Sequence, residues 1–419
     1  MIVYKFGGAS VQSADAVKNI ANIISTIDNK IVVVVSAMGK ITNKLELLID
    51  SYFNKKDDIP QNLETIKSFH LEIISQLFEE NHPIFAKFEQ LIADLSKKLN
   101  SKVSDNFDFE YDKIIVFGEL LSTTIISEYL KSKNIQNQFI DIRKSIITDG
   151  YNRDGRVIWD ETEVQIKQNF KFEENKIFIT QGYIASDRKG NSVTLGREGS
   201  DFSASIIAFC LNAESVTIWK DVPGILNADP RIFEDTFKID RLTYKETVEL
   251  AYYGAQVIHP KTIKPLENKK IPLFVKSFIE PNKNGSIISN FNAEEAIIHK
   301  PIIIIKDNQA LISISPRDFS FIEEGNISKI FTLLESLKIK VNLMENSAVS
   351  FSIIIDNTNK IKEFLNQLKT DFKIKYNTNL KLVTIRHYNQ NVLNELLENK
   401  EIIVEQKTRN TARYAIKDI

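Results

Sequence analysis

The sequence predicts an α/β protein: a three-layer α/β/α sandwich around a mostly parallel central sheet, followed by smaller α+β modules. Short apolar segments alternate with stretches of helical periodicity, a pattern typical of repeated βα units. One segment, Ile31–Val35, is apolar at every position, as in a parallel strand covered on both faces. Only 14 of the 419 residues are glycine, and several of these follow such segments directly. We therefore expect glycine where a ligand-binding turn requires it.

The first part of the chain begins with a strand over Ile2–Phe6. A helix from about Ala14–Ile24 follows, because its apolar residues recur at positions i, i+3, i+4 and i+7. Residues 43–110 contain no glycine and show helical periodicity. We expect several helices there, interrupted at Pro60 and Pro83.

Strands and helices then alternate along the chain. The expected elements are strand Lys113–Phe117, helix Leu120–Lys131, strand Gln138–Ile142, strand Lys176–Thr180, helix Phe202–Leu211, strand Ser215–Trp219, a helix near Tyr244–Tyr253 and strand Pro272–Lys276. In a mostly parallel sheet, ligands bind beyond the carboxyl ends of the strands. The residues expected at those ends are Gly7-Gly8, Ser36, Gly118-Glu119, Gln181-Gly182 and Lys220-Asp221.

The pattern changes after a turn-forming cluster at residues 282–286. Residues 309–419 repeat an order of strand, helix, strand and strand, which predicts two small α+β modules. We expect a first domain at about 1–295 and a second region at about 300–419. The modules are expected at about 309–376 and 380–419, the second being shorter because no helix follows its last strand.

Charge and composition exclude several classes of protein. The chain has 54 Lys and Arg against 55 Asp and Glu, so a net charge of −1 provides no general attraction to nucleic acid or to an anionic membrane. The single cysteine, Cys210, excludes an internal disulfide and a cysteine zinc site. No apolar run approaches the ~20 residues of a membrane span, and the N-terminus has no signal-peptide pattern, so we expect a cytoplasmic protein. The five histidines are scattered, and we expect no metal site built from side chains.

Lys5-Phe6-Gly7-Gly8 places a lysine at a strand end, beside residues whose backbone can approach an anion, with a helix start behind them. This arrangement suits a phosphate group. The alternative is a tight strand-to-helix turn with an exposed lysine. The chain contains no P-loop and no Rossmann glycine fingerprint.

The segment Thr194–Asp201 also suits an anion, because two glycines, a serine and an aspartate lie at an expected helix start. Arg197 can hold a carboxylate with two parallel hydrogen bonds. The alternative is an ordinary capped helix, with Ser200 or Asp201 as the N-cap. Glu119, taken alone, also fits a charge at a helix start.

Six motifs occur in one order along the chain: Lys5–Val11, Val34–Ala37, Phe117–Glu119, Thr194–Asp201, Asp221–Arg231 and Gly254–Pro260. In this set and order the chain resembles the aspartate kinases, a branch of the amino acid kinases. The resemblance covers essentially the whole chain, and the C-terminal region resembles the paired ACT regulatory modules of that family.

The resemblance implies transfer of the γ-phosphoryl group of ATP, with Mg²⁺, to the side-chain carboxylate of L-aspartate, and a homodimer formed through the ACT region. Its implied catalytic residues are Lys5 and Asp201, the latter orienting the lysine. Implied aspartate-binding residues are Thr42, Glu119, Arg197 and Ser200. Implied nucleotide-binding residues are Lys5, Gly7, Gly8, Lys220, Asp221, Leu226, Arg231, Gln256 and Val257.

Several positions depart from the usual family pattern. Gln256 stands where a lysine is usual, Glu198 replaces a glycine of the anion-binding loop, Lys220 replaces a threonine and Leu226 a tyrosine. These departures keep two alternatives open: a catalytically impaired homologue that senses an amino acid, and a kinase for another small carboxylate.

The regulatory region departs from the family as well. Lysine-inhibited relatives present two acidic residues to the effector, and the matching positions here are Asn342 and Ala348. The resemblance therefore implies weak inhibition by lysine.

Overall fold

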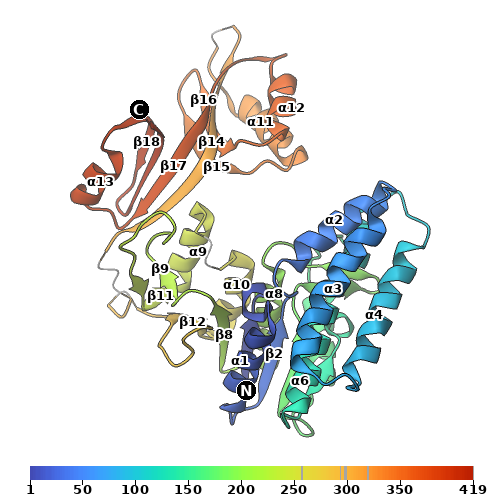
Figure 1. Ribbon diagram of the computed structural model, residues 1–419. Helices are drawn as coiled ribbons and strands as arrows, with labels where there is room; N and C mark the ends of the chain where they lie inside the picture. Colours follow the sequence, from blue (N-terminus) through green and yellow to red (C-terminus); the bar gives the residue numbers. More distant parts are fainter. Residues whose placement is uncertain (256–257, 293, 297–299, 319, 419) are drawn as a thin grey trace. The chain divides into compact units, whose positions relative to one another are not determined.

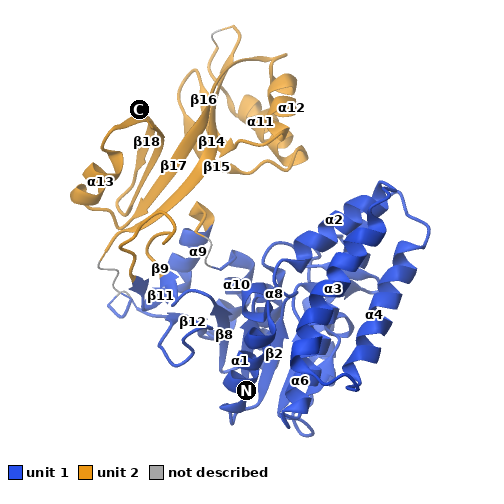
Figure 2. Cartoon of the chain, viewed as in Figure 1, with its two compact units in different colours: residues 1–225, 238–251, 256–297 blue, residues 226–237, 252–255, 298–419 orange. Residues whose placement is uncertain are grey.

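The computed structural model describes residues 1–255, 258–292, 294–296, 300–318 and 320–418. The chain forms two compact units (Figures 1 and 2). Unit 1 comprises residues 1–225, 238–251 and 256–297, and unit 2 comprises residues 226–237, 252–255 and 298–419. None of the helices among the described residues combines the length and apolar character needed to cross a lipid bilayer.

Unit 1 is built on an eight-stranded sheet with the order β11-β13-β12-β8-β1-β2-β5-β3. Its strands are β1 (Ile2–Phe6), β2 (Ile31–Val35), β3 (Gln138–Ile140), β5 (Ile177–Gln181), β8 (Ser215–Lys220), β11 (Arg241–Thr243), β12 (Leu273–Ser277) and β13 (Ser286–Ser289). Every neighbouring pair is parallel except β12 and β13. The predicted α/β class with a mostly parallel central sheet is confirmed.

Two small sheets accompany the main one. A three-stranded sheet contains β4 (Ile147–Thr148), β6 (Ile184–Asp187) and β7 (Ser192–Thr194), and a two-stranded sheet contains β9 (Ile225–Leu226) and β10 (Lys238–Ile239). The sequence patterns predicted none of these short strands, because two to four residues are too few to show a period.

Helices cover the main sheet on both faces. Before residue 297 they are α1 (Ala14–Ser25), α2 (Ile41–Phe53), α3 (Ile59–Leu77), α4 (Ile84–Leu99), α5 (Phe107–Ile115), α6 (Phe117–Ser132), α7 (Trp159–Asn169), α8 (Gly199–Leu211), α9 (Tyr244–Tyr253) and α10 (Pro260–Lys269), with 3₁₀ turns at Gly8–Val11 and Ile142–Lys144. Helices α1 and α6 pack against each other, while α8 packs against β1 and between α7 and α10 (Figure 1). All five residues of β2 are buried, as expected for a strand covered on both faces.

The expected helices between residues 43 and 110 are present, and both prolines mark helix starts. Pro60 lies in the first turn of α3, and Pro83 is the N-cap of α4. Proline suits these positions because the first backbone N–H groups of a helix have no intrahelical partner.

The predicted strand Lys113–Phe117 is wrong. This segment is the end of α5, the linking residue Val116 and the first residue of α6, and Val116 itself has helical dihedral angles. Ile114, Ile115 and Val116 are all buried where the two helices join. Sequence alone cannot distinguish whether an apolar run of this length is a buried strand or part of a helix that is buried on all sides. Gly118 and Glu119 therefore lie in a helical first turn and not at a strand end.

Unit 2 is built on a six-stranded antiparallel sheet with the order β15-β16-β14-β17-β19-β18. Its strands are β14 (Ile302–Pro316), β15 (Val341–Asn346), β16 (Phe351–Asp356), β17 (Phe372–Arg386), β18 (Lys400–Lys407) and β19 (Thr411–Asp418), and its helices are α11 (Glu324–Ser336), α12 (Lys360–Leu368) and α13 (Gln390–Leu397). Strands β14 and β17 have 15 residues each and run through the whole sheet.

The two long strands serve two hydrophobic clusters. One cluster joins Ile312 and Ile314 of β14 to α11 and α12, and another joins Ile303 and Ile305 of β14 to α13. Residues 302–306 pair with residues 382–386. The half of the sheet next to α13 therefore contains a segment that precedes, in the sequence, the whole half next to α11. The sequence pattern suggested successive modules, whereas the sheet interleaves the two halves.

Candidate active site

A buried ion pair joins the end of β1 to the start of α8. Lys5 Nζ lies 2.7 Å from Asp201 Oδ1, and the two side chains are only 11% and 5% exposed. Successive residues of a strand point to opposite faces of the sheet, so Lys5 points toward α8 while Phe6 stacks on Trp219 on the other face. The lysine therefore places a positive charge at the edge of the sheet where ligands are expected.

Gly7 and Gly8 bring the backbone after β1 close to its neighbours. Lys5 Nζ lies 3.4 Å from the position that a Cβ atom on Gly7 would occupy. A Cβ atom on Gly8 would lie 2.8 Å from the carbonyl oxygen of Gly39, so no other residue fits there without movement. Gly39 N also donates to the carbonyl oxygen of Gly8 at 3.0 Å. The loops after β1 and β2 thus form one packed surface beside the lysine ammonium.

Helix α8 begins at this surface. Its N-cap is Glu198 in the left-handed conformation (φ 55°), so the alternative of Ser200 or Asp201 as N-cap is wrong. Ser200 and Asp201 lie inside the first turn, where Asp201 interacts favourably with the positive end of the helix. Ser200 is buried against Gly182, whose added Cβ atom would lie 2.5 Å from the Ser200 Cβ atom. This close approach fixes the start of α8 against the end of β5.

Glu119 lies in the first turn of α6 and is only 3% exposed. Its Oε1 accepts a hydrogen bond from the backbone N–H of Ala37, just after β2, at 3.3 Å. Burial raises the pKa of the Glu119 carboxyl to about 8, an effect that this hydrogen bond and the charge of Lys5 oppose. The carboxyl is therefore ready to lose its proton when a cation binds beside it.

Neither Thr42 nor Arg197 is buried. Thr42 is half-buried in the first turn of α2, and Arg197 is exposed in the loop before α8. Arg197 forms no ion pair with any residue that the structure describes. Both side chains are therefore able to meet a ligand.

The implied nucleotide residues divide between the units. Lys220 ends β8 and Asp221 follows it exposed, both in unit 1. Parallel pairing aligns Phe6 with Trp219 and with Val35, so the chain leaves β1, β2 and β8 at one edge of the sheet.

Leu226 and Arg231 belong to unit 2. The Arg231 guanidinium is paired with the carboxylate of Asp229 at 2.6 Å. Gln256 and Val257 lie outside the described residues.

The structure thus places some of the implied site residues in direct contact and others only on neighbouring segments. Contacts connect Lys5 to Asp201, Gly8 to the loop after β2, and Glu119 to the same loop. Four further implied residues of unit 1 lie near strand or helix ends. They are Thr42 at the start of α2, Arg197 just before α8, and Lys220 and Asp221 at the end of β8.

Sequence reasoning missed Asp112 and Tyr183 as parts of this region, whereas Gly182 was expected at a strand end. Asp112 is fully buried on α5, and burial raises the pKa of both its carboxyl and the Tyr183 hydroxyl. An acidic residue inside the mostly apolar segment Tyr111–Phe117 was the available signal for Asp112. The expected strand Lys113–Phe117 began just after Asp112 and left it in an unassigned position.

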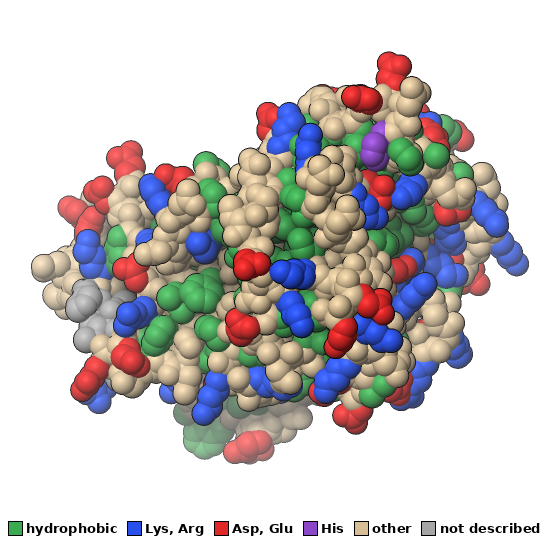
Figure 3. Space-filling view, turned by 90° about the horizontal axis from the view of Figure 1, so that it is seen from below, with side chains coloured by type: hydrophobic (Ala, Val, Ile, Leu, Met, Phe, Trp, Pro, Cys, Tyr) green, Lys and Arg blue, Asp and Glu red, His purple; other side chains and the backbone are tan. Residues whose placement is uncertain are grey.

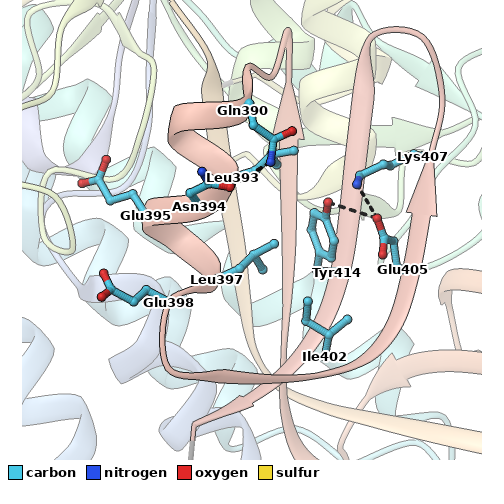
Figure 4. Close-up of a pocket in the computed structure, with 10 residues that line it drawn as sticks. All are labelled: Gln390, Leu393, Asn394, Glu395, Leu397, Glu398, Ile402, Glu405, Lys407 and Tyr414. Atoms are coloured by element: carbon cyan, nitrogen blue, oxygen red, sulfur yellow. Dashed lines mark hydrogen bonds and ion pairs between the residues drawn. The ribbon is translucent and has the colours of Figure 1, made fainter.

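The described residues contain no cluster of three or more His, Cys, Asp or Glu side chains able to hold a metal ion. A cavity of about 590 Å³ lies in unit 2 between α13 and the β18–β19 hairpin (Figure 4). Leu393, Leu397 and Tyr414 line its apolar side, and the Tyr414 hydroxyl donates to Glu405 at 3.3 Å. None of the implied site residues lines this cavity.

Comparison with known proteins agrees with these features. The model of the amino acid kinase family matches residues 1–277. The chain is 31% identical over 359 residues to the lysine-sensitive aspartokinase 3 of Escherichia coli, covering 85% of this chain and 79% of that protein. It is 32% identical over 372 residues to the chloroplastic aspartokinase 2 of Arabidopsis thaliana, covering 84% of this chain and 66% of that protein.

Two solved structures are similar over the whole chain. The crystal structure of E. coli aspartokinase III in complex with aspartate and ADP superimposes with a TM-score of 0.85 at 26% identity, covering 99% of this chain and 96% of that one. The aspartate kinase of Clostridium acetobutylicum gives a TM-score of 0.78 at 25% identity, covering 100% and 96%. The chain therefore belongs to the amino acid kinase family, and within it to the aspartokinases.

Proposed function

We propose that the protein is an aspartate kinase: it transfers the γ-phosphoryl group of ATP to the side-chain carboxylate of L-aspartate, giving 4-phospho-L-aspartate. The observation that carries this function is the buried Lys5–Asp201 pair at the packed loops after β1 and β2, in a chain that aligns with aspartokinases along most of its length. The product is the first intermediate of lysine, threonine and methionine biosynthesis.

The reaction needs little proton chemistry from the protein. The carboxylate nucleophile is already ionised at neutral pH, so no general base is required. Catalysis then depends on positioning and on neutralising the charge of the transferred group. Lys5 supplies that positive charge, and Asp201 holds the ammonium in place. The first N–H groups of α8 add positive potential to the same region.

Aspartate is held through its two charged backbone groups. Arg197, exposed and without an ion pair to the described residues, suits the α-carboxylate, because a guanidinium binds a carboxylate with two parallel hydrogen bonds. The buried Glu119 suits the ammonium group. Thr42 and Ser200 complete the pocket.

ATP is held by Gly7, Gly8, Lys220 and Asp221 in unit 1, with Leu226, Arg231, Gln256 and Val257 as further nucleotide contacts. Mg²⁺ enters with the nucleotide. Bound there, it would neutralise the charge of the phosphate oxygens during the transfer.

Residues 1–295 form the catalytic domain in this proposal, and residues 300–419 form paired ACT-like modules that assemble a homodimer. The six-stranded antiparallel sheet with separate helix-covered clusters supports the ACT assignment. A cytoplasmic location is part of the same proposal. On the face shown in Figure 3, acidic and basic side chains are interspersed, which agrees with small-molecule substrates better than with nucleic acid or a membrane.

The first prediction concerns the substrate. In a coupled assay of ADP formation, L-aspartate accelerates ADP release, while L-glutamate and a nucleoside monophosphate do not. Preference for either of the last two compounds would contradict the proposal. Binding of aspartate without turnover would favour the sensing homologue, and turnover of another carboxylate would favour the second alternative.

The second prediction concerns Lys5. Lys5→Ala lowers kcat by about 100-fold or more, since it removes charge stabilisation of the transition state. Because this variant leaves Asp201 buried without its partner, the double variant Lys5→Met with Asp201→Asn separates stability from catalysis: it folds but stays inactive. Lys18→Ala, which removes an exposed lysine of the same unit, serves as the control. Near wild-type turnover of Lys5→Ala would show that the site is assigned wrongly.

The third prediction concerns pH. Glu119 in the free enzyme is protonated below its pKa of about 8, and ammonium binding requires the ionised form. The value of kcat/KM for aspartate therefore rises about tenfold per pH unit up to about pH 8 and then levels, because this parameter reports the pKa values of the free enzyme. Glu119→Gln removes the rise. A wild-type profile that is flat from pH 6 to 8 would contradict the assigned role.

The same pKa shift also has a consequence for stability. The folded state holds a proton that the unfolded state releases near the ordinary glutamate pKa, so the free energy of unfolding falls as the pH rises from about 4.5 to 8. Thermal melting of the ligand-free proteins should show Glu119→Gln gaining stability over wild type across that interval.

The fourth prediction concerns regulation. Asn342 is only 5% exposed, and its amide group is fully used: Nδ2 donates to Gln309 Oε1 at 2.7 Å and to Asp356 Oδ1 at 2.9 Å, while Oδ1 accepts from Lys306 Nζ at 2.8 Å. A lysine effector would therefore lack charged partners at Asn342 and Ala348, each typically worth ~1.5–3 kcal/mol.

Titration of lysine and threonine into the kinase assay at constant ionic strength measures this regulation. We expect little inhibition by lysine in the micromolar range. Strong inhibition at micromolar lysine would contradict the prediction.

A further inference from the structure

Asp112, a buried aspartate on α5, has no part in the reaction described above. Its side chain is completely buried, and it forms no ion pair with any residue in the described part of the chain. Burial of an ionisable group without a cation is costly, so such a residue needs compensating hydrogen bonds.

Three hydrogen bonds supply that compensation, and they come from two different segments. Oδ1 of Asp112 accepts from the Thr194 hydroxyl at 2.7 Å, at the end of β7. Oδ2 accepts from Asn152 Nδ2 at 2.8 Å and from the backbone N–H of Arg153 at 2.9 Å, in the turn between β4 and α7. Each carboxylate oxygen thus holds one segment.

The two segments also pack on each other directly before Arg197. The backbone N–H of Gly155 donates to the carbonyl oxygen of Thr194 at 2.9 Å. A Cβ atom on Gly196, which has φ 78°, would lie 2.6 Å from Asp154 Oδ1. The turn at 152–155 therefore forms the wall against which the Arg197 loop rests, and Asp112 holds the wall and the loop together.

Helix α5 strengthens the same connection with further side chains. The Arg153 guanidinium lies 4.3 Å from the centre of the Tyr111 ring and 3.2 Å from Asp108 Oδ1. These contacts tie Arg153, which has a left-handed backbone (φ 64°), to the helix that carries Asp112.

The helix also connects to Glu119. Helix α5 passes into α6 through Val116, whose dihedral angles are helical, so no flexible loop separates Asp112 from Glu119. One buried carboxylate thus lies between the residue that holds the ammonium group of aspartate and the loop that holds its α-carboxylate.

We propose that Asp112 is a positioning residue for the amino acid substrate: it fixes the Arg197 loop relative to Glu119, so that both ends of one amino acid are held together. The proposal rests on the proposed function, because Arg197 and Glu119 bind aspartate only if that function is right.

The test is a set of steady-state measurements on Asp112→Asn in the full-length chain. The substitution replaces one carboxylate oxygen by an NH₂ group. Both oxygens accept hydrogen bonds in the wild type, so the new N–H groups face donors instead of acceptors. We expect KM for aspartate to rise about tenfold or more, with KM for ATP within twofold and kcat within about threefold.

The matched control is Glu110→Gln. Glu110 lies on the same helix, is also buried, and bonds Lys98 Nζ at 2.5 Å and the Ser104 N–H at 3.2 Å, away from the Arg197 loop. Loss of this buried charge disturbs α5 in a similar way but leaves KM for aspartate unchanged. An equal rise of KM in both variants would mean that Asp112 is only structural, and would overturn the proposal.

A second pair of variants keeps the test decisive if Asp112→Asn fails to fold. Thr194→Val removes the hydroxyl that bonds Asp112 and keeps the side-chain shape, while Thr194→Ser keeps the hydroxyl. We expect the valine variant to raise KM for aspartate and the serine variant to restore it. Unchanged KM in Thr194→Val, with an active wild type, would overturn the proposal alone. A wild type that does not phosphorylate aspartate would overturn the proposed function instead.

Discussion

The ion pair between Lys5 and Asp201 is the constraint on which the site depends. Neither charge can be buried alone at a tolerable cost, since an uncompensated ion in a protein interior costs several kcal/mol. The end of β1 and the start of α8 must therefore lie in contact in the folded chain. Their meeting brings together a lysine ammonium, the N-terminus of a helix and, just after β1, two glycines, groups that suit a phosphoryl group.

Close backbone contacts at two glycines also hold the elements of the site together. Gly8 lies against the loop after β2, and Gly182 lies against Ser200 at the start of α8. At both positions a side chain would meet backbone or Cβ atoms within 3 Å, so neither neighbour could move without displacing a whole element. The sparing use of glycine in this chain is thus informative, because these glycines mark places where two elements must touch.

Much of this arrangement could be predicted from residue patterns. The parallel sheet, the strand end at Lys5 and the anion-binding segment at Arg197 follow from local periodicity and from residue types. The wrong strand at Lys113–Phe117 shows the limit of that reasoning. An apolar run carries no sign of whether its surroundings are helices or strands, and the choice depends on what packs around it. The interleaved halves of the unit 2 sheet escaped prediction for the same reason, since strand pairing between distant segments leaves no local period.

The sequence by itself determined the class of fold, the family and the residue types available for phosphoryl transfer, because these depend on motifs that are short and ordered along the chain. The resemblance implied that Asp201 orients the lysine, but tertiary structure alone decided the burial and the geometry of the partners. The pairing of Lys5 with Asp201, the raised pKa of the Glu119 carboxyl and the three donors around Asp112 all arise from burial and from contacts between distant segments. Charge and hydrogen bonding depend on the surroundings of a side chain, and those surroundings exist only once the chain has folded.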